Sequence, residues 1–310
     1  MGYNTPMPDS EELWNLYWEV RLQELEDLGK REAILATSQL VRRLAVLPAQ
    51  PVRLLELGCG EGKVISTLVE AHAQVHAIHT SLGVDYSHQS IEKCRRAYRG
   101  LAFLEGDFTD RSLTSKLSQF EIVLLVNALH EVFSAGYSAE LQEVAVPAAK
   151  QRVEQAIAGA VECLVTGGYL VLFDGLETSG DIQELLTIRF LNPQARSQFD
   201  VFVREYHPFR ISYRELNSPF LIELSRRDFT RYITKSIFLG KHLWNTERLE
   251  SYQYYNEAEF RLALTRQGLT ICELRTLTVN DEKWRNQVRI ETPGVDFPPE
   301  HILIIAQKPV

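Results

Sequence analysis

The chain has 310 residues, of which 45% are hydrophobic and 24% charged, so it has the composition of a globular protein with one large domain or two small ones. The formal net charge of -8 argues against a nucleic acid as partner, because an acidic protein gains little from neutralising phosphates. There is no apolar run of about 18 residues that would predict a transmembrane helix, and residues 1–10 do not resemble a signal peptide. The four scattered cysteines fit a reducing, cytoplasmic location, and their spacing predicts no metal site.

The first 50 residues are predicted to form a helical lid. Apolar side chains recur at helical spacing over residues 9–46. Gly29 is expected to break this helix, which then resumes over residues 34–44. Tyr17 and Trp18 lie in the first half of the lid and are candidates for contact with a substrate.

Residues 51–175 alternate between strand and helix patterns, which predicts βαβ units and a parallel sheet. Residues 120–127 are apolar on both faces, as expected of a central strand. Residues 73–81 are expected to form either an extended loop or a longer second strand. The predicted strands are 53–57, 82–85, 102–105, 120–127 and 169–173, and the predicted helices are 63–71, 89–98 and 149–164.

Residues 176–250 break this rhythm and are predicted to be an inserted cap. The alternation of Phe199, Val201 and Val203 favours an antiparallel strand, as do similar patterns at 211–213 and 220–222. The segment carries 11 Lys+Arg and 10 Asp+Glu, so it is not a basic patch for nucleic acid. The sheet pattern returns over residues 251–310, with a helix at 256–267 and strands at 269–279 and 301–307.

Three glycines, Gly58, Gly60 and Gly62, follow the first strand and open a helix. Glycines at such a position let the backbone approach a ligand closely. A dinucleotide loop would need a further glycine where Lys63 stands. A tight turn without a ligand is the alternative interpretation.

The segment Glu56-Leu57-Gly58-Cys59-Gly60-Glu61-Gly62 resembles the first motif of class I S-adenosylmethionine-dependent methyltransferases. Four further segments resemble later motifs of this family and occur in the same order. They are Gly83-Val84-Asp85-Tyr86-Ser87, Gly106-Asp107-Phe108, residues 120–128 and Gly167-Gly168-Tyr169-Leu170. The resemblance covers residues 52–175 well and the last 55 residues loosely.

The resemblance implies an α/β, Rossmann-like sheet of seven strands in the order 3-2-1-4-5-7-6, with the last strand antiparallel. The N-terminal helical segment and a mixed α+β cap after the fifth strand would be added to this sheet. S-Adenosylmethionine is the implied cofactor and S-adenosylhomocysteine its product. No metal is implied.

The resemblance also implies roles for single residues. Asp85 would accept hydrogen bonds from both ribose hydroxyls, and the alternative is that it caps the next helix. Asp107 would accept from the adenine amino group, and the alternative is a turn residue. The other implied cofactor contacts are Glu56, Gly58, Cys59 and Gly60 around the methionyl part, Tyr86 and Phe108 near the adenosine, and Asn127 and Ala128 at the end of the fourth strand.

The end of the fourth strand faces the transferred methyl group in this family. His130 is a candidate general base for a hydroxyl acceptor, because its ordinary pKa lies near neutrality; a structural histidine is the alternative. Glu131 is a second catalytic candidate that would orient His130 or bind substrate, or else is a solvated carboxylate at a helix start. The Asn/Asp-Pro-Pro-Tyr/Phe motif of enzymes that methylate adenine or glutamine is absent here, which argues against those acceptors.

The sequence predicts a small-molecule methyltransferase, with O-methylation favoured, acting as a monomer or homodimer. Arg210 and Tyr213 of the cap are expected to bind the acceptor together with Tyr17, Trp18 and His130, although the cap aromatics could equally be core residues. An RNA or protein methyltransferase of the same fold is the main alternative. A nicotinamide-dependent oxidoreductase and a non-catalytic cofactor-binding protein are the others.

Overall fold

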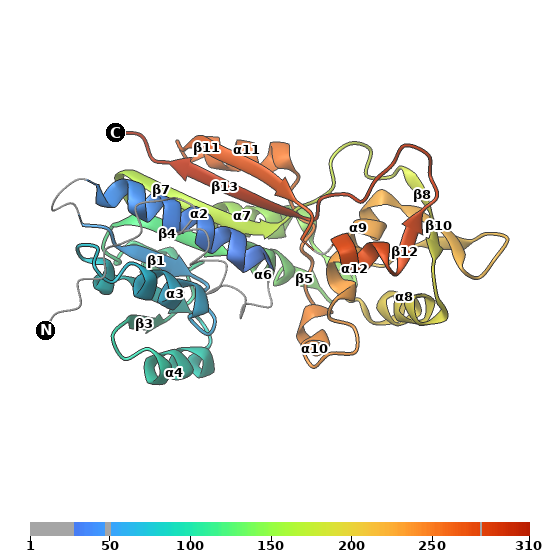
Figure 1. The fold of residues 1–310 in the computed structure, drawn as a ribbon, viewed down its shortest axis with the longest axis horizontal. Helices are drawn as coiled ribbons and strands as arrows, with labels where there is room; N and C mark the ends of the chain where they lie inside the picture. The colour runs from blue at the N-terminus through green and yellow to red at the C-terminus, as the bar shows by residue number, and fades with distance from the viewer. Residues whose placement is uncertain (1–27, 47–50, 280) are drawn as a thin grey trace, which may run out of the picture.

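The computed structural model describes residues 28–46, 51–279 and 281–310. Its main body is a seven-stranded sheet in the order β11-β13-β7-β4-β1-β2-β3 (Figure 1). Strands β3, β2, β1, β4 and β7 are parallel neighbours, and β13 runs antiparallel to both β7 and β11. When the strands of this sheet are numbered 1 to 7 along the chain, the order read from β3 to β11 is 3-2-1-4-5-7-6. The predicted fold is therefore confirmed. The strands are β1 (Leu54–Leu57), β2 (Leu82–Asp85), β3 (Ala102–Glu105), β4 (Phe120–Val126), β7 (Leu164–Gly175), β11 (Thr270–Leu277) and β13 (His301–Gln307).

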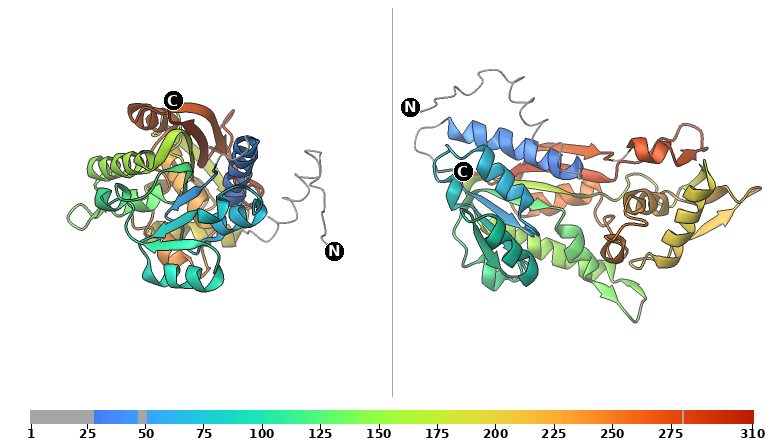
Figure 2. Two further views of the ribbon diagram at one scale, coloured as in Figure 1. Left: turned by 90° about the vertical axis from the view of Figure 1, so that its left-hand side faces the viewer. Right: turned by 60° about the horizontal axis from the view of Figure 1, so that its bottom comes forward.

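Helices cover both faces of this sheet (Figure 2). The central strand β4 is buried on both sides because its side chains alternate between two hydrophobic cores. Ile122 and Leu124 pack in the core beneath α2, whereas Val123 and Leu125 pack in the core beneath α7. One face carries α2 (Leu28–Ala45), α3 (Lys63–Ala71) and α4 (His88–Ala97), and the other carries α5 (Arg111–Thr114), α7 (Val146–Glu162) and α11 (Glu257–Arg266).

The connection between α3 and β2 is a loop, which is one of the two alternatives expected from the sequence. It contains the short 3-10 helix η1 (Ile78–Thr80), and β2 begins only at Leu82. The hydroxyl of Ser81 donates to the Ile78 carbonyl and accepts from the Leu54 amide at 2.8 Å. This buried serine therefore fixes the loop to the start of β1.

The inserted cap is built around a second, four-stranded antiparallel sheet in the order β12-β8-β10-β9. It lies beside the carboxyl ends of the parallel strands of the main sheet, where β7 leads into it (Figure 1). Strand β12 (Val288–Ile290), which follows α12 (Asp281–Arg285), comes from the chain between β11 and β13 rather than from the insertion after β7. The other cap elements are β8 (Leu185–Phe190), α8 (Pro193–Glu205), β9 (Tyr213–Glu215), β10 (Leu221–Ser225), α9 (Arg226–Ser236) and α10 (Trp244–Glu247).

The strand expected around residues 199–203 is wrong, because these residues lie within helix α8. The side chain of Asn192 accepts a hydrogen bond from the Ala195 amide and caps the helix, and Pro193 occupies its first turn. Ala195, Phe199 and Phe202 are buried at helical spacing. The alternation of apolar residues over 199–203 is thus coincidental. The residues that α8 buries follow helical spacing and include Phe199 and Phe202.

The break expected at Gly29 is also wrong, because α2 is already helical at Leu28 and continues to Ala45. Gly29 is buried, and the helix packs along β7 and α3. This tertiary packing outweighs the low helix propensity of glycine, which costs about 1 kcal/mol. None of the helices in the described ranges is long and apolar enough to cross a membrane.

Replacing a buried leucine of the central sheet should destabilise the whole fold. Leu172 in β7 has no exposed surface. We expect Leu172→Ala to lower the free energy of unfolding by about 2–5 kcal/mol, as measured by urea denaturation, because it leaves a cavity between packed layers. Leu262→Ala on the outer side of α11, where the leucine is 49% exposed, is the control and should change this free energy by less than about 1 kcal/mol.

Candidate active site

The carboxyl ends of β1, β2, β3 and β4 meet at one edge of the sheet, so the residues predicted from the first four motifs lie together. The amides of Gly58 and Cys59 donate to the Val84 carbonyl at 2.8 and 2.9 Å, which joins the glycine loop to β2. The amide of Gly106 donates to the Asp85 carbonyl at 2.9 Å, which joins the third motif to the same strand end.

The glycine loop requires glycine at Gly58. Its φ of 76° is in the left-handed region, and a Cβ there would lie 2.7 Å from the Cβ of Ala128. Gly60 also has a positive φ of 50°, and a Cβ at this position would meet nothing within 4 Å. At Gly58 the loop therefore packs closely against Ala128, which follows the end of β4, whereas there is free space beside Gly60.

Glu56 lies below this loop and is buried. Its Oε2 accepts a hydrogen bond from the Ile65 amide at 3.0 Å, which fixes the start of α3 to β1. Burial raises the pKa of Glu56 to about 8, against the opposing effect of that hydrogen bond. Burial also raises the pKa of the Cys59 thiol, so this cysteine is not an activated nucleophile.

The carboxylate of Asp85 organises the loop. Its Oδ2 accepts from the Gly60 amide and its Oδ1 from the Ser87 amide, both at 2.8 Å. The following helix α4 is capped by Ser87, whose Oγ accepts from the Ser90 amide at 3.2 Å. Asp85 is thus not the side-chain cap of α4, and each of its oxygens keeps a lone pair for a further donor.

A cavity of about 610 Å³ opens beside these residues and is referred to below as the cleft. Tyr86, Asp107 and Phe108 line one side of it, and Ala128, Glu131 and Val132 line another. Arg152 and Gln155 of α7 complete the wall. The size fits a cofactor, and the set of carboxylate and aromatic side chains suits a ribose, an amino group and a flat base.

The side chain of Asp107 stabilises the turn that follows β3, which is the alternative role expected from the sequence. Its Oδ1 accepts from the amide of Thr109 at 2.8 Å and from the hydroxyl of Thr109 at 2.7 Å. The side chain nevertheless lines the cleft and is exposed there. The structural and the ligand-binding interpretations of Asp107 are therefore compatible.

His130 is buried at the start of helix α6 (Leu129–Ser134) and lies between two carboxylates. Its Nδ1 is 2.8 Å from Oδ1 of Asp174, at the end of β7. Its Nε2 is 3.5 Å from Oε2 of Glu250, and its ring stacks on that of Tyr252 with 3.7 Å between centroids. Burial lowers the pKa of His130, but the two carboxylates outweigh burial and raise it to about 10.

This environment does not favour the general-base role expected for His130. Both ring nitrogens face carboxylates, which favour the doubly protonated imidazole, and that form has no lone pair with which to accept a proton. Asp174 also binds the helix itself, because its Oδ2 accepts from the amides of Leu129 and His130 at 2.8 and 3.2 Å. The geometry favours the alternative interpretation, a structural histidine that holds α6, and the general-base role stays a prediction.

Glu131 is the catalytic candidate that the structure places in the cleft. Its neighbours in α6 are buried, whereas its own side chain is exposed to the cavity. The surrounding protein raises the pKa of Glu131 to about 7 mainly by desolvation, against the attraction of the nearby His130. A carboxylate with this pKa can accept a proton near neutral pH.

The predicted substrate contacts are not brought together. Tyr17 and Trp18 lie outside the described residues. Arg210 and Tyr213 are exposed on the cap and do not line the cleft, and the hydroxyl of Tyr213 accepts from Arg196 at 3.4 Å. Arg210 and Tyr213 are therefore surface residues of the cap.

Sequence reasoning missed Asp174, Glu250 and Tyr252. Asp174 had a usable signal, because it stands at the carboxyl end of the predicted fifth strand, where site residues of parallel sheets gather. Glu250 and Tyr252 had none, since their contacts with His130 span about 120 positions of the chain.

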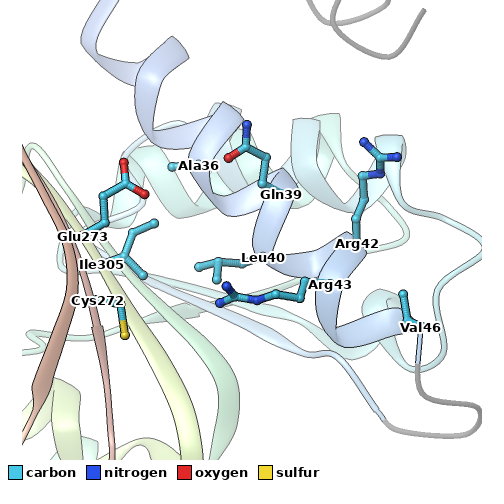
Figure 3. Close-up of a pocket in the computed structure, with 9 residues that line it drawn as sticks. All are labelled: Ala36, Gln39, Leu40, Arg42, Arg43, Val46, Cys272, Glu273 and Ile305. Carbon is cyan, nitrogen blue, oxygen red and sulfur yellow. The ribbon is translucent and has the colours of Figure 1, made fainter. Parts of the chain in front are cut away.

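A second cavity, of about 520 Å³, lies between α2 and the strands β11 and β13 (Figure 3). It is lined by Gln39, Arg42 and Arg43 on the helix side and by Cys272 and Glu273 on the sheet side. None of the predicted cofactor residues lines it, so it is separate from the cleft at the strand ends.

Residues 54–167 match a family model described as a methyltransferase domain. Nothing among the curated proteins matches the sequence.

Solved structures with a similar fold include an S-adenosylmethionine-dependent methyltransferase from Mesorhizobium loti, at 16% identity and a TM-score of 0.43, covering 87% of this chain and 96% of that one. Magnesium protoporphyrin IX methyltransferase from Synechocystis PCC 6803, with bound S-adenosylhomocysteine, is 13% identical at a TM-score of 0.44, covering 95% and 94%. The N-methyltransferase NodS from Bradyrhizobium japonicum WM9 is 12% identical at a TM-score of 0.41, covering 90% and 98%. Similarity this low does not identify the acceptor of this chain.

The ionised His130 should make stability depend on pH in a defined direction. Its folded pKa of about 10 exceeds the ordinary value of 6.5, so its contribution is complete below about pH 6.5 and is lost as the pH rises towards 10. We expect the stability advantage of the wild type over His130→Gln, measured by urea denaturation, to shrink between pH 7 and pH 10. An advantage that stays constant over this range would show that His130 is not held as a cation.

Proposed function

We propose that this chain, a class I S-adenosylmethionine-dependent methyltransferase, transfers a methyl group to a small-molecule acceptor, with O-methylation favoured. The match of residues 54–167 to a methyltransferase-domain model supports this assignment. The observation that carries the proposal is the cleft at the strand ends, where Glu131 faces the space beside the glycine loop and Asp85.

The residues around the cleft fit the cofactor. Asp85 would hold the ribose hydroxyls with its remaining lone pairs, and Asp107 the adenine amino group. Tyr86 and Phe108 would pack against the adenosine. The remaining proposed contacts, near the methionyl part and the end of β4, are Glu56, Gly58, Cys59, Gly60, Asn127 and Ala128.

When bound, S-adenosylmethionine supplies a methyl group that its sulfonium charge has already activated. The protein then has to hold the acceptor in line with that methyl group and exclude water. For a hydroxyl acceptor, we propose that the Glu131 carboxylate takes the hydroxyl proton as the oxygen–carbon bond forms. A carboxylate acceptor would need no proton acceptor.

Three features support a small acceptor over RNA or protein. The cap lies beside the strand ends, where an extended polymer would have to dock. The cleft contains the carboxylates of Asp107 and Glu131, which would repel a phosphate backbone. Of the three cap arginines that could hold an anion, Arg189, Arg210 and Arg214, the first and last are paired with Glu291 and Glu223, which reduces the positive charge offered to a polyanion.

The assembly and location proposed from the sequence are a monomer or homodimer in the cytoplasm. Cys59, Cys94 and Cys163 are buried free thiols, and Cys272 is exposed and free, which fits a reducing compartment.

Asp85→Asn tests the cofactor assignment. The variant loses the charge that would accept both ribose hydroxyls, so we expect the affinity for S-adenosylhomocysteine, measured by calorimetry, to fall about 10- to 100-fold. Asp110→Asn is the matched control, because Asp110 caps α5 on the exposed surface and does not line the cleft. Unchanged affinity in Asp85→Asn, or tight binding of NADH alone, would contradict the proposal.

Glu131→Gln tests the proton acceptor. With an acceptor found by screening small hydroxylated compounds for transfer of a tritiated methyl group, we expect kcat to fall about 100- to 10,000-fold. The wild-type rate should rise with pH through about 7, because only the ionised carboxylate accepts a proton, and the variant should lose this rise. Glu140→Gln, in the exposed loop between β5 (Tyr137–Ser138) and β6 (Glu143–Val144), is the matched control.

The alternatives give different results. If Glu131→Gln keeps the rise near pH 7, another group takes the proton. If the wild type binds S-adenosylhomocysteine and transfers methyl only to RNA or protein, the small-molecule proposal fails and the cofactor assignment stands.

A further inference from the structure

Three successive residues at the end of the cap, 250–252, contact helix α6. The carboxylate of Glu250 pairs with His130, and the ring of Tyr252 stacks on the ring of His130. Between them, the amide of Ser251 donates to Oγ of Ser134 at 2.8 Å, and this hydroxyl donates to the His130 carbonyl at 2.7 Å. We refer to residues 250–252 as the clamp.

A buried lysine holds the clamp from the other side. Lys235 of α9 has no exposed surface, and its Nζ lies 2.7 Å from Oε2 of Glu247 and 3.9 Å from Oε2 of Glu250. The same Nζ lies 3.9 Å from the centroid of the Tyr252 ring. The centroid of the His130 ring lies 3.7 Å from the same centroid in a stacked arrangement, so we infer that the two groups occupy opposite faces of Tyr252. The tyrosine ring thus contacts both the Lys235 amine and the His130 ring, and a positive charge on either one is attracted to it by cation–π interaction.

The clamp also touches the main sheet directly. A Cβ on Gly175, the last residue of β7, would lie 2.3 Å from the carbonyl oxygen of Tyr252. The preceding residue is Asp174, whose Oδ1 accepts from the Gly175 amide at 2.7 Å as well as facing His130. The clamp therefore cannot shift without moving the end of β7.

Helix α6 depends on these partners for its position. It has only six residues, and its N-cap residue Ala128 offers no side-chain cap. On the core side, Asp174 accepts hydrogen bonds from the first amides of α6. On the cap side, the clamp donates a hydrogen bond to Ser134 of the same helix. Glu131 and Val132 are the residues of α6 that line the cleft, and of these two only Glu131 is exposed.

We infer that Glu250 and Lys235 are positioning residues that bind the cap to α6 through Tyr252 and His130, so that docking of the cap fixes where Glu131 lies in the cleft. The inference deepens the proposed function by linking the cap to the cleft, and it rests on that function only for the identity of the ligand. By thermodynamic reciprocity, a ligand that orders the cleft also orders the cap.

Ionisable groups from several elements face this junction. They are Asp174 of β7, Glu131 of α6, Lys235 of α9, Glu247 of α10, His301 of β13, and Glu250 and Tyr252 of the clamp. Glu250→Gln keeps the shape of the side chain and removes the charge that pairs with His130. Glu223→Gln is the matched control, because Glu223 pairs with Arg214 within the cap sheet.

Hydrogen–deuterium exchange of the full chain, with and without S-adenosylhomocysteine, tests the inference. In Glu250→Gln we expect residues 129–135 and 244–252 to exchange together about 10- to 100-fold faster than in the wild type, as for the loss of one charge-assisted hydrogen bond. The ligand should slow exchange at 244–252 in the wild type and in Glu223→Gln, and should not do so in Glu250→Gln. Histidine ¹⁵N spectra at pH 8 should show that the His130 ring carries both protons in the wild type and loses one more readily in Glu250→Gln.

The inference is overturned if Glu250→Gln exchanges like Glu223→Gln, or if bound ligand leaves the wild-type cap unprotected. If the wild type does not bind S-adenosylhomocysteine, the proposed cofactor site fails, and the ligand-free exchange still decides whether the clamp holds α6. If Glu250→Gln does not fold, Ser134→Ala removes a clamp contact without changing charge. Ser134→Ala should then raise exchange at 129–135 and 250–252, and unchanged exchange would overturn the inference.

Discussion

The carboxylate of Asp174 accepts four hydrogen bonds at the point where β7 leaves the main sheet. The donors are the amides of Leu129, His130 and Gly175 and the ring of His130. A fully buried carboxylate is costly unless donors replace its water, and here the replacement donors are the start of α6 and its histidine. The ends of β4 and β7 are thereby held in one arrangement, and the position of α6 depends on it.

Helix α6 is shared by the cleft and the cap. Its exposed residue, Glu131, faces the cleft, and its buried residues His130 and Ser134 contact the clamp. The hydrophobic core beneath α7 is also continuous with the interior of the cap, through side chains such as Phe199 and Tyr232. The cap therefore shares its interior with one face of the sheet.

The sequence predicted the main sheet well because parallel strands have short, strongly apolar patterns with glycine-rich ends. Strands β2 and β3 and helix α3 have the predicted bounds. The cap was predicted less well, because alternation and helical spacing coincide over a few residues. Phe199, Val201 and Val203 alternate, yet α8 buries Phe199 together with Phe202.

The sequence by itself determined the parallel α/β class through its local patterns, and the resemblance of five ordered motifs to a known family implied the strand order and the residues that gather at the strand ends. Only the tertiary structure decided the state of His130, because its partners Asp174 and Glu250 come from distant segments and their charges outweigh the effect of burial. The same contacts bury His130 against α6 and its partners, whereas Glu131 lines the cleft. Chemistry that depends on burial and on neighbouring charge is fixed by folding, and the residue type alone does not specify it.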